Sequence, residues 1–222
     1  MMREGESAET YIVNRYKVWE GWDGAFDYKH AKGERIARIL LETGGLAPIA
    51  LELGVGPGGV AAALSRHGMK IVGIDLSPEA LVRAQAHCRG ENVRLMRGSG
   101  FQLPLADKSL PLVYASQVLH LFDSSKRLRL MAEAHRVLLP GGRFVFDMKN
   151  LAPHVLRVFK YSAEGRRQNF PSSSHIAGLL REAGFSSVVK RPGLLPLMAS
   201  SRVPNNILSR TVAHTTFFVA TR

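Results

Sequence analysis

The chain has 222 residues and a formal net charge of +12 at pH 7, from 30 Lys and Arg against 18 Asp and Glu. A hydrophobic fraction of 45% and a charged fraction of 22% predict a globular protein with a substantial core and exclude a mostly disordered chain. No run of about 18 apolar residues occurs, so no transmembrane helix is expected, and the polar first ten residues do not resemble a secretory signal. The single cysteine, Cys88, excludes an intramolecular disulfide framework and favours a cytoplasmic protein.

The positive charge is distributed unevenly along the chain. Residues 1–120 carry a net charge of +1, whereas residues 121–222 carry +11. A positive field of this size favours anionic partners such as nucleic acid, phosphorylated or carboxylated small molecules, or acidic lipid. A solvated, arginine-rich surface without a ligand would have the same charge, so the charge alone identifies no partner.

Short apolar segments alternate with helical patterns along most of the chain. Strands are predicted at residues 49–53, 70–74, 93–97, 112–115, 143–148, 185–190 and 215–221. Helices are predicted at residues 30–43, 60–67, 77–88, 123–139 and 172–184. Strands joined by helices across short loops predict an α/β fold with a mostly parallel sheet and helices on both faces. Ligands of such sheets bind beyond the carboxyl ends of the strands, beside the first strand.

A glycine-rich loop, ELGVGPGG at residues 52–59, follows the first predicted strand and leads into a helix. Gly54, Gly56 and Gly59 match the G-x-G-x-x-G pattern of dinucleotide-binding enzymes. The acid at position 52, with the glycines at 54, 56 and 58, also matches the acidic-x-G-x-G-x-G loop of methyltransferases. Two classes of adenosine-containing cofactor therefore fit the same loop.

The acidic residue of the loop distinguishes the two patterns. Backbone amides at a helix N-terminus bind pyrophosphate, and a carboxylate at Glu52 would repel that anion. S-adenosylmethionine has no phosphate and carries sulfonium and ammonium groups, which an acid beneath the glycine turn suits. Asp75 lies 21 residues after Gly54, where an acid binds ribose hydroxyls under both patterns. The Tyr28-x-x-x-Lys32 pair precedes the loop, which is the wrong order for a short-chain NAD-binding oxidoreductase.

Five segments carry a resemblance to a known family; they span residues 50–59, 72–81, 96–107, 112–122 and 137–146. On these segments the chain resembles the class I (Rossmann-like) S-adenosylmethionine-dependent methyltransferases over about residues 30–190. The resemblance implies S-adenosylmethionine as cofactor and an α/β fold with a seven-stranded, mostly parallel sheet whose last strand is antiparallel. It implies a single methyltransferase domain over residues 1–222. Its expected parts are an aromatic N-terminal helical lid (1–29), a cofactor-binding half (30–148) and an acceptor-side half (149–222) with a long loop at 192–213.

The resemblance also implies which residues bind the cofactor. Asp75 would bind the ribose hydroxyls, and Leu76 would pack on the adenine. Ser99 stands where family members commonly have an Asp that binds the adenine amine, so a backbone carbonyl or a water is expected to take over this contact. The expected cofactor-binding residues are Tyr16, Glu52, Gly54, Gly56, Gly58, Asp75, Leu76, Ser99, Gly100, Phe101, Ser116 and Gln117. No metal site is expected, because no metal-ligand spacing of His and Cys occurs.

His120 is the candidate catalytic residue. It lies in the segment from Ser116 to Phe122, which leaves the fourth predicted strand at the cofactor edge. An acceptor that attacks through oxygen usually needs a base, and an unperturbed histidine titrates near neutrality. A packing role beneath the loop is the alternative for this side chain.

The leading hypothesis is S-adenosylmethionine-dependent methyl transfer to a small-molecule acceptor by in-line displacement. The basic second half favours an anionic acceptor, because residues 149–171 and 192–213 are expected at the acceptor rim. An RNA methyltransferase that uses this basic half is the alternative, although no appended RNA-binding module is present. A NAD-binding oxidoreductase and a non-catalytic cofactor-binding protein are less favoured. The oligomeric state is left open.

Overall fold

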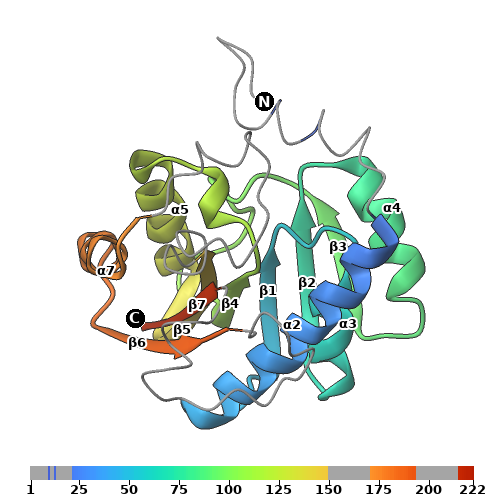
Figure 1. Ribbon diagram of the computed structural model, residues 1–222, viewed down its shortest axis with the longest axis horizontal. Helices are drawn as coiled ribbons and strands as arrows, with labels where there is room; N and C mark the ends of the chain where they lie inside the picture. Colours follow the sequence, from blue (N-terminus) through green and yellow to red (C-terminus); the bar gives the residue numbers. More distant parts are fainter. Residues whose placement is uncertain (1–9, 11–12, 14–21, 150–170, 194–214) are drawn as a thin grey trace, which may run out of the picture.

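Seven strands form one sheet across the middle of the molecule (Figure 1). The computed structural model describes residues 10, 13, 22–149, 171–193 and 215–222. The strands are β1 (Ile49–Leu53), β2 (Lys70–Asp75), β3 (Val93–Arg97), β4 (Leu110–Ala115), β5 (Leu138–Lys149), β6 (Ser187–Pro192) and β7 (Thr215–Thr221). Their order is β3-β2-β1-β4-β5-β7-β6, and β7 runs antiparallel to both β5 and β6. The predicted mostly parallel sheet with an antiparallel last strand is confirmed.

Helices cover both faces of this sheet, as predicted. They are α2 (Trp22–Glu42), α3 (Gly59–Arg66), α4 (Pro78–His87), α5 (Ser124–Val137), α7 (Ser173–Glu182) and the 3-10 turn η1 (Leu119–Leu121). On one face, Ile36 of α2 and Val60 of α3 belong to a core that includes Tyr114. On the other face, Met131 of α5 and Ile176 of α7 form a second core with the sheet. No described helix has the length and apolar character needed to cross a membrane.

Side-chain caps begin the helices that follow the strands. The Ser77 hydroxyl accepts a hydrogen bond from the N–H of Ala80 at 3.2 Å, and Pro78 is the first residue of α4. The Asp123 carboxylate accepts a hydrogen bond from the N–H of Lys126 at 2.9 Å and starts α5. These caps end the loops that follow β2 and β4, and so set the edge of the sheet where a ligand would bind.

Helix α2 lies close against α3 and reaches the carboxyl ends of β1 and β4. A Cβ atom at Gly33 would lie only 2.4 Å from the Cβ of Ala63, so glycine permits the close approach of the two helices. The buried residues Lys29, Lys32 and Ile36 follow one another at helical spacing. Among the described side chains of α2, the buried ones are therefore mostly apolar from Ile36 onward, whereas Lys29, Lys32 and Arg35 are buried cations.

The structure corrects several predicted boundaries. Helix α2 begins at Trp22 rather than at residue 30, so residues 22–29 of the expected lid are the first turns of a long helix. Strand β5 begins at Leu138 rather than at residue 143, because Leu138 pairs with Leu110 of β4. Strand β6 is shifted two residues toward the C-terminus, because it continues its pairing with β7 to Pro192. Pairing partners distant in sequence set these ends.

Several expectations concern segments outside the described residues. They include Tyr16 and most of the expected lid before residue 22, residues 150–170 of the expected acceptor rim, and the part of the loop at 192–213 that follows Gly193.

Candidate functional site

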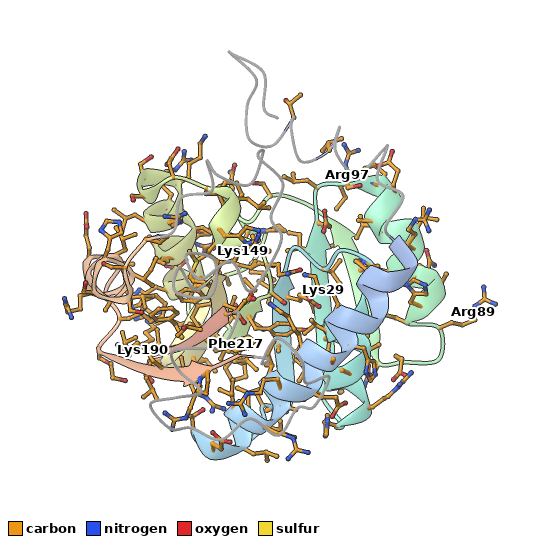
Figure 2. All side chains as sticks on the ribbon, viewed as in Figure 1. Lys29, Arg89, Arg97, Lys149, Lys190 and Phe217 are labelled. Carbon is orange, nitrogen blue, oxygen red and sulfur yellow. The ribbon has the colours of Figure 1, made fainter. Side chains whose placement is uncertain are left out.

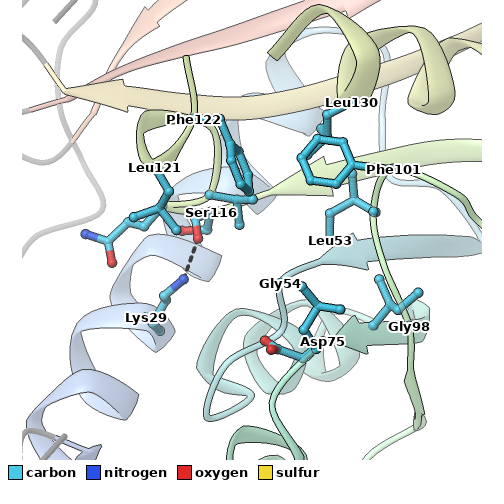
Figure 3. A pocket seen from close by; sticks show the side chains of 15 residues that line it. Lys29, Leu53, Gly54, Asp75, Gly98, Phe101, Ser116, Leu121, Phe122 and Leu130 are labelled. Carbon is cyan, nitrogen blue, oxygen red and sulfur yellow. Dashed lines mark hydrogen bonds between the residues drawn. The ribbon is translucent and has the colours of Figure 1, made fainter. Parts of the chain in front are cut away.

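A cavity opens at the carboxyl ends of β1, β2 and β4 (Figure 3). It encloses about 570 Å³ of empty space, part of which is open to solvent. This is the position at which open α/β sheets bind ligands. Its wall is formed by Lys29, Leu53, Gly54, Ile74, Asp75, Leu76, Gly98, Gly100, Phe101, Ser116, Gln117, Val118, Leu121, Phe122 and Leu130.

The glycine loop adopts backbone conformations that favour glycine. Gly54 has φ of +69°, and a Cβ atom there would lie 2.6 Å from Cγ2 of Val118. Gly56 has φ of +54°, with no atom within 4 Å of the position of a Cβ. Gly58 has φ of +86° and packs against α4, where a Cβ would meet the sulfur of Cys88 at 2.7 Å. Gly54 therefore lines the cavity, whereas Gly58 allows the loop to pack on α4.

Asp75 organises the loop and also faces the cavity. Its Oδ2 accepts a hydrogen bond from the N–H of Gly56 at 2.9 Å, and its Oδ1 accepts one from the N–H of Ser77 at 3.0 Å. Burial raises the pKa of this carboxyl, although the two backbone N–H groups oppose the shift. Each carboxylate oxygen has a second lone pair, so Asp75 can still accept hydrogen bonds from ligand hydroxyls.

Glu52 lies beneath the loop and is fully buried, outside the cavity wall. Its Oε2 accepts a hydrogen bond from the Tyr114 hydroxyl at 3.0 Å, while its Oε1 has no hydrogen-bond partner among the described residues. Burial raises the pKa of Glu52 to about 8, against the opposing effect of Lys29. A buried acceptor of this kind calls for a donor such as an ammonium group or a water molecule.

The segment after β3 forms the opposite wall of the cavity. Gly100 and Phe101 line it, but Ser99 does not, because its hydroxyl accepts a hydrogen bond from the N–H of Phe101 at 3.3 Å. The rings of Phe101 and Phe122 meet edge to face with their centroids 5.0 Å apart. Leu130 lies beside them in Figure 3. This apolar wall suits a flat heterocycle such as adenine.

The end of β4 presents polar groups to the cavity. Ser116 and Gln117 line the wall, and the buried Ser116 hydroxyl has no hydrogen-bond partner among the described residues. Gln117 has φ of +59°, an uncommon conformation for a residue other than glycine. Its N–H donates a hydrogen bond to Oδ1 of Asp147 at 2.6 Å. Strained backbone held by a buried carboxylate is typical of functional sites.

Three charged residues that the sequence analysis did not select lie buried beside this wall: Lys29, Lys32 and Asp147. Lys29 lines the cavity and donates a hydrogen bond to the backbone carbonyl of Ser116. Lys32 forms an ion pair with Asp147, so it is a structural group and not half of an oxidoreductase dyad. The available sequence signal was the helical spacing of the two lysines with Ile36, which places them on the buried stripe of α2.

His120 lies on η1 and outside the cavity wall, although Leu121 beside it lines the cavity. Burial and the positive charge of Lys149 lower the pKa of His120 to about 3. The imidazole is therefore uncharged at neutral pH and is a weak base. Its assignment as the catalytic base stays a prediction.

The residues present fit S-adenosylmethionine. A carboxylate faces the cavity at the end of β2, an apolar wall stands opposite, and the buried Glu52 Oε1 and Ser116 hydroxyl oxygen lack partners among the described residues. No group of three or more His, Cys, Asp or Glu residues that could hold a metal ion occurs within the described ranges.

Comparisons with known proteins agree with this geometry. The family model for the methyltransferase domain matches residues 51–146. An uncharacterised methyltransferase of Synechocystis sp. is 32% identical over 164 residues, which cover 71% of this chain and 76% of that protein. The demethylmenaquinone methyltransferase of Chlorobaculum parvum is 28% identical over 204 residues, which cover 81% of each chain.

A solved structure has the same fold over almost the whole chain. It is a SAM-dependent methyltransferase from Thermotoga maritima, described as a "possible histamine N-methyltransferase". Its TM-score is 0.74 at 20% identity, and the match covers 97% of this chain and 99% of that one. These matches show that the chain belongs to the class I S-adenosylmethionine-dependent methyltransferases, enzymes whose methyl donor is S-adenosylmethionine.

Proposed function

We propose that the protein transfers a methyl group from S-adenosylmethionine to a small-molecule acceptor that carries negative charge. The observation that carries this proposal is the excess of lysine over carboxylate near the end of β4, where Lys32 and Lys149 stand against Asp147 even when Lys29 is uncharged. The buried Lys29 enters the cavity beside them, next to Ser116. In Figure 2 the surface cation Arg89 extends outward from the edge of the molecule, whereas Lys29 lies near the middle of the view and is buried.

The cavity supports a specific orientation of the donor. Asp75 and Leu76 would bind the adenosine part, with Phe101 against the adenine. Gly54 would lie against the methionine part, with Glu52 beneath the loop, and Ser116 at the end of β4 would face the methyl group that is transferred. Of the other expected residues, Gly100 and Gln117 would contribute from the wall, Gly56 and Gly58 from the loop, Ser99 through its backbone and Tyr16 from the N-terminal segment. The bound sulfonium supplies a methyl group with a good leaving group, so positioning and exclusion of water would account for much of the catalysis.

The charge near the end of β4 supports an anionic acceptor. Three lysines, Lys29, Lys32 and Lys149, act electrostatically on His120 there, and Asp147 is the carboxylate that opposes them. Asp147 is itself paired with Lys32. An anion would therefore meet excess positive charge in a site of low dielectric constant, where such interactions are strong.

The relatives support a small-molecule acceptor. By its name, the Chlorobaculum relative acts on demethylmenaquinone, and the Thermotoga structure is described in terms of histamine. RNA is the competing acceptor, because the second half of this chain carries a net charge of +11. A nucleic acid would be bound largely through its phosphates, with an affinity that falls steeply as salt rises.

The test uses S-adenosylmethionine with a radiolabelled methyl group and four acceptors. These are 2-hydroxybenzoate as a hydroxyl acceptor with a carboxylate, reduced demethylmenaquinone, histamine as a cation, and bulk tRNA. Label transfer to 2-hydroxybenzoate in preference to histamine supports the proposal. Transfer to tRNA alone, with binding that weakens steeply between 50 and 200 mM salt, establishes the RNA alternative. Transfer to histamine alone overturns the anionic acceptor.

A further inference from the structure

We propose that Lys29 is a catalytic residue that loses its proton when the methyl donor binds and then accepts the proton of a hydroxyl-bearing acceptor. This inference rests on the proposed function and adds the group that removes the acceptor's proton. It concerns a side chain on α2, outside the five segments that resemble the methyltransferase family.

The position of Lys29 is the first observation. Its side chain is 8% exposed and lines the cavity (Figure 3). In Figure 3 it enters from α2, on the side opposite Gly98, and the dashed line joins it to Ser116. The nitrogen therefore lies at the end of β4, which is the side of the cavity proposed for methyl transfer.

The hydrogen bonding of Lys29 contrasts with that of Lys32, one turn along the same helix. Lys32 pairs with a carboxylate, which stabilises an ammonium ion. Lys29 instead donates to a neutral backbone carbonyl. An ammonium group has three N–H donors to satisfy, whereas an amine that donates one N–H to a carbonyl retains a lone pair for a proton.

The surroundings of Lys29 stabilise a cation weakly. Burial lowers the pKa of Lys29, and the carboxyls of Glu52 and Asp147 oppose that shift. The pKa of Glu52 is itself raised to about 8, so much of its negative charge is absent at neutral pH, and Asp147 is neutralised by Lys32. The charged and titratable groups that face Lys29 are Glu52 of β1, Asp75 of β2, Asp147 of β5, Lys32 of α2 and His120 of η1.

Binding of the methyl donor would bring a second cation into the same cavity. Like charges in a partly desolvated site disfavour each other, so a bound sulfonium favours the uncharged form of Lys29. S-adenosylhomocysteine has a neutral sulfur and lacks this effect. The methyl donor and its product would therefore differ in the number of protons that their binding releases.

The proton transfer balances without any other reactant. The lone pair of Lys29 Nζ forms an N–H bond as the O–H bond of the acceptor breaks. The electron pair left on the acceptor oxygen forms the new bond to the methyl carbon, and the pair of the carbon–sulfur bond remains on sulfur. Lys29 ends the step as an ammonium ion next to a neutral thioether, and the proton passes to solvent.

The test is calorimetry of S-adenosylmethionine and S-adenosylhomocysteine binding between pH 5 and 9, in buffers of different ionisation enthalpy. The slope of the observed heat against that enthalpy counts the protons released. The variants are Lys29→Met, Lys29→Arg and, as matched control, Lys70→Met, which removes an exposed lysine at the start of β2. Each ligand's own amino group makes the same contribution in every variant, so differences between variants isolate Lys29.

The wild-type protein and Lys70→Met should release more protons with S-adenosylmethionine than with S-adenosylhomocysteine, by an excess that is smaller in Lys29→Met. Lys29→Arg keeps a permanent cation, so its preference for S-adenosylhomocysteine over S-adenosylmethionine should rise about tenfold or more. Lys29→Met removes the cation, so its preference for S-adenosylhomocysteine over S-adenosylmethionine should fall. Because the two substitutions change this preference in opposite directions, a general loss of folding cannot imitate the result.

Two other outcomes have distinct meanings. If Lys29→Met lowers the affinity for both ligands by the same factor and leaves the number of released protons unchanged, Lys29 anchors the ligand or supports β4. That result overturns the inference. If the wild-type protein binds neither ligand, the proposed function fails before the role of Lys29 arises.

Discussion

Lys32 and Asp147, which lie 115 residues apart in the sequence, form a buried ion pair between α2 and β5. The second carboxylate oxygen of Asp147 accepts a hydrogen bond from the N–H of Gln117 at 2.6 Å. The Asp147 side chain thus connects α2 and the end of β5 with Gln117, which lies two residues after β4 in the cavity wall. The position of the cavity wall at the end of β4 depends on this connection.

Replacing Asp147 with Asn should destabilise the fold by about 3–5 kcal/mol, because it leaves Lys32 as a buried charge without a carboxylate. The pKa of Asp147 is lowered in the folded state, because Lys32 and the Gln117 N–H outweigh the effect of burial. Its contribution to stability is therefore present above the unfolded pKa and is lost as the pH falls below about 4.

Chemical denaturation at pH 7 and pH 3 measures this difference. The matched control is Asp107→Asn, whose carboxylate pairs with Arg136 but is 69% exposed. The control should change the free energy of unfolding by less than about 1 kcal/mol. An equal effect of the two substitutions at pH 7 would contradict a structural role for the buried pair.

Replacing Glu52 with Gln should change how stability depends on pH. Burial raises the folded-state pKa of Glu52 to about 8, so its stabilising contribution is complete below the unfolded pKa and is lost as the pH rises through 8. Relative to wild type, Glu52→Gln should gain stability between pH 5 and 9 with a slope of at most about 1.4 kcal/mol per pH unit. Denaturant titrations at pH 5, 7 and 9 test this, and parallel curves for the two proteins would refute it.

Replacing Asp75 with Asn should lower the affinities for S-adenosylmethionine and S-adenosylhomocysteine by similar factors, about 10- to 100-fold, because a charged hydrogen-bond acceptor is lost from the cavity. Its oxygens also accept hydrogen bonds from Gly56 and Ser77, so a moderate loss of stability should accompany the effect. Calorimetry measures the affinities and thermal unfolding measures the stability. Unchanged affinity in a folded variant would exclude Asp75 from the binding site.

Replacing Gly54 with Ala should abolish cofactor binding, whereas Gly68→Ala should preserve it. Both glycines have positive φ, +69° and +85°, so both substitutions carry a similar backbone strain of about 1–2 kcal/mol. Only at Gly54 does the added methyl meet a neighbour, at 2.6 Å from Val118, since nothing lies within 4 Å at Gly68. Binding isotherms for both variants at equal folded fraction make the comparison, and equal affinities would contradict it.

Replacing His120 with Gln tests the base predicted from the sequence. With its pKa lowered to about 3, His120 does not titrate near neutrality, so the midpoint of the rate–pH profile should stay unchanged even if kcat falls. Single-turnover rates between pH 5 and 9 on an acceptor found in the radiolabel assay give this midpoint. Loss of the acidic limb in His120→Gln, with the limb retained in Lys29→Met, would assign the base to His120.

Local patterns in the sequence were sufficient for the fold and for the glycine loop and Asp75 at one side of the cavity. Apolar runs predict buried parallel strands, Ser77 and Asp123 mark helix starts, and the spacing from Gly54 to Asp75 marks a strand–loop–helix–strand unit. These features lie within a few residues of one another or repeat with the period of one element. A single sequence therefore contains them in full.

Contacts between distant segments determine the wall of the cavity at the end of β4. Lysines on a helix are normally expected to face solvent, and only the packing of α2 across β1 and β4 buries Lys29 and Lys32. Asp147, which follows the apolar residues 144–146 of β5, acquires its role from Lys32 and Gln117, at separations of 115 and 30 residues. Similarly, the tertiary environment makes His120 a weak base.

The sequence by itself determined the fold and the class of cofactor, because both depend on local pattern. Only the tertiary structure decided which charges are buried at the end of β4, because burial and pairing depend on residues that the chain brings together after it folds.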